Sequence, residues 1–295
     1  MRWLGFAVLA LCGALAVWLW GYGGMEDLSR WAASGQRDVQ NQMAGALRGI
    51  KAGQGAAFWT LMGLCFAYGF FHAAGPGHGK VLIGGYGLGR DVARVKLAGL
   101  AVASSLAQAL TAVVVVYAGV GLFQLGRAQL EGVAEKTMAP VSYGAIALVG
   151  VWLGLRGVRR WWASRPVDHH EHHEGCGCGH AHGPDPEAAA KVGNWREAAI
   201  LIASIAIRPC TGAIFVLLLC WKLGIDLAGI AGAFVMGLGT ASVTLLVAFA
   251  AHGLRTSALM QVAGGTGALR LQAVIEIAAG AIVCIAASQL LMRAL

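Results

Sequence analysis

Two histidines flank a proline-containing interruption of an apolar segment. His72 and His78 lie on either side of Gly75-Pro76-Gly77. On an unbroken helix, residues six apart point about 120° away from each other, whereas a Gly-Pro-Gly break allows both imidazoles to converge on one ion. Neutral imidazole suits nickel, copper, zinc and cobalt better than calcium or magnesium. The pattern therefore predicts a transition-metal site, and the alternative is a pair of hydrogen-bonded structural histidines.

A second concentration of metal-binding side chains lies between residues 168 and 182. This tract has no apolar periodicity and cannot build a core, and its spacing differs from that of a structural zinc finger. We expect a flexible segment that collects metal, and the alternative is a dispensable, non-specific chelator. Its candidate ligands are His169, His170, His172, His173, Cys176, Cys178, His180 and His182.

The elements that position these residues are long apolar segments. The chain has 295 residues, of which 58% are hydrophobic and only 12% charged, so it lacks the charged surface of a soluble domain. A bilayer core of about 30 Å requires about 20 apolar helical residues. An all-α polytopic membrane protein is predicted, with seven spans near residues 3–25, 52–79, 97–126, 137–155, 198–221, 227–254 and 271–292.

The first span is expected to stay as an anchor, although a cleaved signal sequence is the alternative. Lys and Arg residues are concentrated in alternate loops between the spans. Because cytoplasmic loops carry the excess of basic residues, this pattern favours a cytoplasmic N-terminus and an external C-terminus. The net charge of +8 is therefore explained by basic residues that orient the chain in the lipid bilayer, and it does not indicate nucleic-acid binding. The predicted units are an anchor (1–24), an external amphipathic segment on the membrane surface (25–55), a three-helix unit (56–155), a cytoplasmic loop (156–197) and a second three-helix unit (198–295).

The two three-helix units share a layout. Each begins with a proline-broken span, 52–79 or 198–221, and continues with a span that carries polar residues. Three spans per unit place the units in opposite orientations, as in the inverted repeats of many secondary transporters. Proline kinks and small polar residues are also common in membrane helices, which is the alternative explanation. The polar candidates for a transport pathway are Ser104, Ser105 and Gln108 in the first unit and Thr240 and Ser242 in the second.

Two ionisable residues lie well inside predicted spans. Arg208 and Glu276 are costly in lipid and are expected to form a pair or to line a pathway. Their predicted depths differ by only about 6 Å at 1.5 Å per residue, so an ion pair between them is one expectation. The alternative is that Glu276 exchanges protons as metal moves. Separately, Gly150 and Gly154 form a small-xxx-small face that predicts close helix packing.

The segment H-A-A-G-P-G-H-G-K (72–80) resembles the signature of the NicO-type nickel/cobalt transporter family, especially its RcnA-type exporters. The segment R-P-C-T-G (208–212) is similar to the second motif of that branch, which makes Cys210 a third candidate metal ligand. Related permeases carry an acidic residue where this chain has Gly77, and this departure favours the exporter branch. The resemblance covers residues 56–292 and implies a multi-pass protein of the bacterial inner membrane.

The function implied is secondary-active export of Ni²⁺ or Co²⁺ as substrate, with no permanently bound cofactor. No G-x-x-x-x-G-K-[ST] segment occurs, so ATP hydrolysis and enzyme activity are not expected, and proton coupling is the expected driver. Uptake of the same ions is the alternative. A membrane thiol–disulfide carrier is a distant alternative, because Pro209-Cys210 fits one break but Pro76-Gly77 lacks the second thiol.

Overall fold

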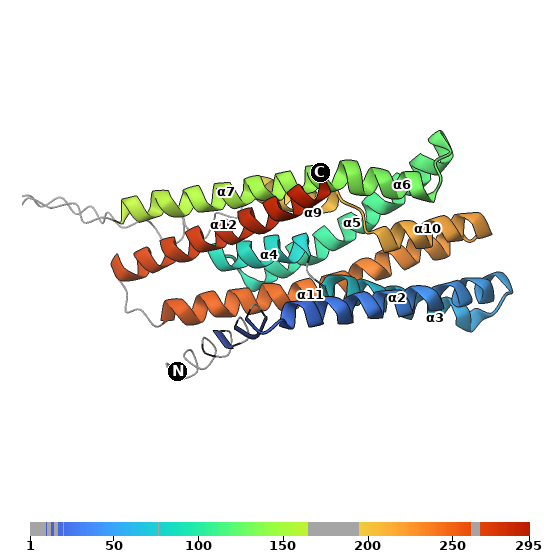
Figure 1. Ribbon diagram of the computed structural model, residues 1–295, viewed down its shortest axis with the longest axis horizontal. Helices are drawn as coiled ribbons and strands as arrows, with labels where there is room; N and C mark the ends of the chain where they lie inside the picture. The colour runs from blue at the N-terminus through green and yellow to red at the C-terminus, as the bar shows by residue number, and fades with distance from the viewer. Residues whose placement is uncertain are drawn as a thin grey trace, which may run out of the picture.

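The computed structural model describes residues 10, 13–14, 17–19, 21–75, 77–164, 195–260 and 266–295, without the side chains of His78, Met260 and Thr266. The described residues form helices and no strand, so the all-α prediction is confirmed (Figure 1). The helices are α2 (Gly24–Lys51), α3 (Gly55–Ala74), α4 (His78–Gly89), α5 (Arg94–Phe123), α6 (Arg127–Val133), α7 (Ala139–Ala163), α9 (Trp195–Ala206), α10 (Thr211–Leu223), α11 (Asp226–Met260) and α12 (Thr266–Ala294), with a π-helical turn, Ala134–Met138, between α6 and α7.

Six of the seven predicted spans have counterparts among these helices. Five segments in the described part of the chain are long and apolar enough to cross a membrane: α3, α5, the α6–α7 segment, α11 and α12. A sixth arises if α9 and α10, which are bent by 65° at their junction, count as one broken span. The predicted first span, 3–25, lies mostly outside the described residues. The protein is therefore a multi-pass membrane protein.

Both predicted breaks are present. Helix α3 ends at Ala74, and Gly75 and Gly77 have extended backbones before α4 begins at His78. Helix α9 ends at Ala206, and α10 begins at Thr211 with Cys210 in an extended conformation as its N-cap. Because α4 continues to Gly89, the first broken segment is longer than the predicted span 52–79.

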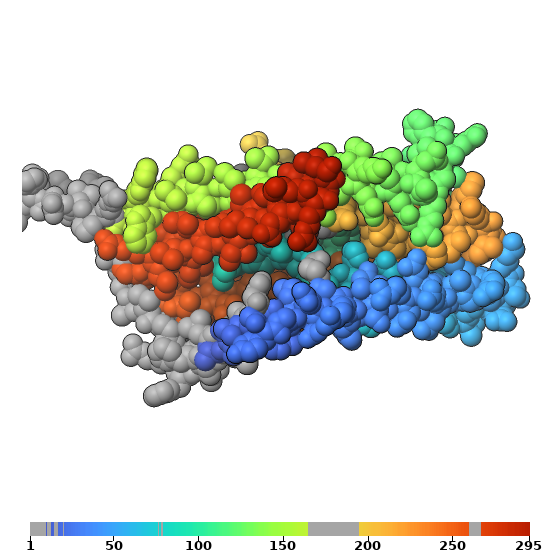
Figure 2. Space-filling view, viewed as in Figure 1, coloured from blue at the N-terminus to red at the C-terminus, as the bar shows by residue number. Residues whose placement is uncertain are grey.

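Helix α2 is the predicted amphipathic helix, and it packs along α3 (Figure 1). Figure 2 shows α2 forming one long edge of the molecule. Its apolar residues Val39, Met43 and Leu47 are buried in one core cluster with residues of α3 and α10. Protein therefore covers the face that the sequence assigned to lipid, because either environment satisfies an apolar stripe equally well. The position of α2 relative to the membrane surface stays a prediction.

The helices of the two sequence halves interleave: α3 packs on α11, α5 on α9 and α11, and α7 on α12. The α7–α12 contact is very close, because a Cβ added to Gly280 would lie 2.4 Å from the nitrogen of Gly154 and 2.7 Å from the carbonyl oxygen of Gly150. A Cβ added to Gly150 would lie 2.6 Å from the nitrogen of Cys284, whereas one added to Gly154 would meet nothing within 4 Å. The predicted small-xxx-small face is therefore confirmed at Gly150 and not at Gly154. The inverted relation between the halves stays a prediction.

Candidate metal site

A cavity of about 90 Å³ lies where the two helix breaks meet. The first break contributes His72 and Gly77, and the second contributes Arg208, Pro209 and Cys210. Segments more than 130 residues apart in the sequence therefore enclose one space. The remaining lining residues are Ala73, Gly79 and Lys80 near the first break, Ile205 and Thr211 near the second, Ser104, Ser105 and Gln108 on α5, and Thr240 and Thr244 on α11.

His72 is held by a residue of α2. The Nδ1 atom of His72 lies 3.3 Å from Oε1 of Gln36. The Gln36 amide nitrogen donates to the carbonyl oxygen of Ala32 at 3.3 Å, which leaves Oε1 as the acceptor toward the imidazole. His72 Nδ1 must then carry the proton, so the lone pair available to a metal is on Nε2.

Tyr68 links the two breaks. Its ring stacks on His72 with 6.2 Å between ring centroids and 10° between planes. It also packs directly over Gly212, where an added Cβ would lie 2.1 Å from the ring. Only glycine leaves room for this approach, which brings the start of α10 next to the end of α3.

Two polar side chains stabilise the backbone that the breaks leave open. Lys80 donates to the carbonyl oxygens of Ala74 and Gly75 at the end of α3. Gln108 on α5 donates to the carbonyl oxygen of Arg208 at 3.1 Å. These contacts explain why the irregular backbone is stable within the helix bundle.

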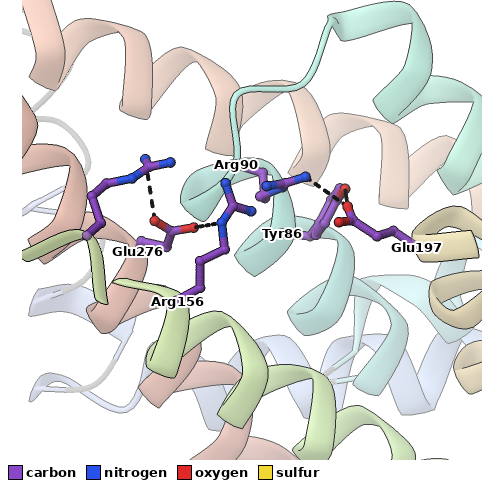
Figure 3. Close-up of polar contacts among 6 residues, drawn as sticks. Tyr86, Arg90, Arg156, Glu197 and Glu276 are labelled. Atoms are coloured by element: carbon purple, nitrogen blue, oxygen red, sulfur yellow. Dashed lines mark hydrogen bonds and ion pairs between the residues drawn. The ribbon is translucent and has the colours of Figure 1, made fainter. Parts of the chain in front are cut away.

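The predicted Arg208–Glu276 pair is not formed. Arg208 donates to the hydroxyl group of Tyr143 on α7, and Glu276 lies 3.2 Å from Arg156 and 3.4 Å from Arg160 (Figure 3). The prediction compared depths along the span, and depth does not specify which side of a helix faces which neighbour. The close packing of α7 on α12 brings the two arginines to Glu276, whose side chain is fully buried.

Further ion pairs lie in the same region of the bundle. Arg90, at the C-cap of α4, lies 2.8 Å from Glu197 of α9, and Tyr86 donates to the same carboxylate at 3.1 Å (Figure 3). Arg255 lies 3.0 Å from Asp91. The side chains of Arg90 and Arg255 are nearly fully buried, although both lie outside the predicted spans. The pairs join α4, α7, α9, α11 and α12.

The cavity brings together most of the described candidates. It includes His72, Cys210, Arg208, Ser104, Ser105, Gln108 and Thr240. It does not include Glu276 or Ser242. The hydroxyl group of Ser242 donates to the carbonyl oxygen of Gly239. The side chain of His78 and the loop candidates between 169 and 182 lie outside the described residues.

Sequence reasoning missed Gln36 and assigned no role of its own to Lys80, the last residue of the 72–80 motif. A signal for Gln36 was present, because it lies three, seven and eleven residues before Val39, Met43 and Leu47, on the buried face of α2. A polar residue within an apolar stripe needs a partner. Here the partner is His72.

The cavity offers neutral donors of three kinds: an imidazole, a thiol, and hydroxyl and amide oxygens. Among the described residues, no three His, Cys, Asp or Glu side chains are grouped closely enough to hold an ion. Nitrogen and sulfur donors favour first-row transition metals over magnesium and calcium.

Comparison with known proteins agrees with this chemistry. The NicO family model, described as "High-affinity nickel-transport protein", matches residues 58–176. A protein of Haemophilus influenzae named "Putative nickel/cobalt efflux system" is 30% identical over 241 residues, which cover 74% of this chain and 72% of the relative. No solved structure matches the chain. The chain therefore belongs to the NicO family of nickel/cobalt transport proteins.

Proposed function

We propose that the protein exports Ni²⁺ or Co²⁺ across a bacterial inner membrane as a secondary-active transporter, with the central cavity as the substrate site. The observation that carries this proposal is the meeting of His72 and Cys210 in one cavity between two broken helices. Broken helices at a buried site are typical of secondary transporters. Membership of a nickel/cobalt transport family supports the choice of ions.

The fold supports an alternating-access mechanism. Each half supplies one broken segment and one polar helix to the cavity wall, so rocking one half against the other would change the side to which the cavity opens. The ion pairs of Glu276 with Arg156 and of Glu197 with Arg90 join helices of both halves. We expect such contacts to form in one state and break in the other, with a proton gradient as the driver.

Two arguments favour the outward direction. The relative from Haemophilus influenzae is named as an efflux system. The histidine-rich tract 168–182 is predicted to be cytoplasmic, where it would collect ions for export. Uptake is the competing direction.

Transport measurements in inverted membrane vesicles test the proposal. We expect Ni²⁺ or Co²⁺ to accumulate inside such vesicles when a proton gradient is imposed, and H72A to abolish the accumulation. H252A is a matched control, because His252 is a histidine of α11 that does not line the cavity. Normal transport by H72A would refute the assignment of the site. Accumulation of the ions in intact cells, and not in inverted vesicles, would show uptake in place of export.

A further inference from the structure

A small void adjoins the wall of the central cavity between α5, α10 and α11. Its volume is about 10 Å³, close to the space that one water molecule requires. It shares Ser105, Gln108, Cys210 and Thr240 with the larger cavity and adds Met236 of α11. The void therefore lies directly beside the central cavity and has room for one water-sized group.

Two sulfur atoms face each other at this void. The Sγ atom of Cys210 lies 3.8 Å from the Sδ atom of Met236. With metal–sulfur bonds of about 2.3 Å, as for zinc, two sulfurs at this separation subtend about 110° at the ion, close to the tetrahedral angle. The pair thus has the spacing of two metal ligands before any ion arrives.

The backbone on both sides of the sulfur pair is firmly positioned. Gly69 of α3 approaches Met236 so closely that an added Cβ would lie 1.9 Å from the Met236 carbonyl oxygen. Thr240 donates to that oxygen at 3.2 Å and also contacts the carbonyl oxygen of Gly69 at 3.3 Å. Cys210 is held at the N-terminus of α10. An ordinary core methionine next to a thiol is the competing explanation.

We propose that Cys210 and Met236 form a second metal position beside His72, at which one thiolate and one thioether bind the transported ion. This inference rests on the proposed function, because the ion would arrive through the central cavity. A thiol that coordinates a divalent cation loses its proton, here to cavity water, so each ion bound releases one proton. The N-terminus of α10 favours the negative sulfur that remains. Hydroxyl groups and water complete the coordination.

The sulfur pair limits which metal ions this position can bind. Thiolate and thioether ligands select Cu⁺, Zn²⁺ and other thiophilic ions and disfavour Mg²⁺, Ca²⁺ and Mn²⁺. Nickel and cobalt remain suitable, because imidazole, thiolate and oxygen donors are all within the cavity. The position therefore acts as a filter against the abundant oxygen-preferring cations.

Cobalt spectroscopy on the detergent-purified full-length chain tests this proposal apart from transport. Cys176 and Cys178 are first replaced by Ser, so that the loop thiols do not contribute. Co²⁺ is then expected to produce a sulfur-to-cobalt charge-transfer band with the release of one proton per ion. The band should persist in H72A with weaker binding and disappear in C210S.

Met236→Leu is the decisive variant, because it keeps the apolar volume and removes only the thioether. We expect at least a tenfold loss of Co²⁺ affinity with unchanged elution on size exclusion. M62L is the matched control, since Met62 is buried in the same core. An unchanged titration in M236L, or no band in the parent protein, would overturn the proposal. A normal band in a protein that fails to transport nickel or cobalt would refute the proposed function alone.

Discussion

The contact between Gln36 and His72 makes α2 part of the metal site, and Gln36→Leu tests it. The variant removes the acceptor for His72 Nδ1, which lies 3.3 Å from Gln36 Oε1. Loss of such an outer partner lowers metal affinity about 10- to 100-fold. Because 3.3 Å is long for an N–H···O bond, we expect the lower end, about tenfold, which corresponds to about 1.4 kcal/mol.

The assay is Ni²⁺ uptake into inverted vesicles over a range of concentrations. In Q36L the half-saturating concentration should rise about tenfold while the maximal rate changes little, because the imidazole remains but its tautomer and orientation are no longer set. Q36E should retain near-normal affinity, since a carboxylate also accepts from Nδ1. Q42L is the control, because Gln42 is exposed on the same helix. Equal behaviour of Q36L and Q42L would refute the positioning role.

Three further changes have defined outcomes. Glu276→Gln leaves Arg156 and Arg160 without their buried counter-charge and should destabilise the protein by about 3 kcal/mol, seen as a lower melting temperature in detergent, whereas Glu131→Gln on the surface should have little effect. Gly69→Ala would place a methyl group 1.9 Å from the Met236 carbonyl oxygen and should reduce folded yield, whereas Gly63→Ala, which meets nothing within 4 Å, should be tolerated. Deletion of residues 168–182 should slow transport at low metal concentration and leave the rate at saturation unchanged. A deletion variant that transports as fast as the parent protein at both concentrations would instead favour the dispensable chelator.

Much of the fold could be predicted because its signals are local. Length and apolarity identified the five long membrane segments of the described residues and a sixth if α9 and α10 count as one span, and proline and glycine identified both breaks. The motifs at 72–80 and 208–212 identified His72 and Cys210 as candidates without any knowledge of their spatial relation. Polar residues in spans indicated α5 and α11 as cavity walls.

The partners of these residues depended on packing. The sequence alone determined most of the long helices, the two breaks and the family, because each follows from residue types at short spacing, and it also predicted a transition-metal site. Only the tertiary structure decided that Glu276 pairs with Arg156 and Arg160, that α2 covers α3, and that Gln36 reaches His72. These contacts depend on how each helix is rotated about its axis, and hydrophobic periodicity specifies a buried face without specifying the neighbour that buries it.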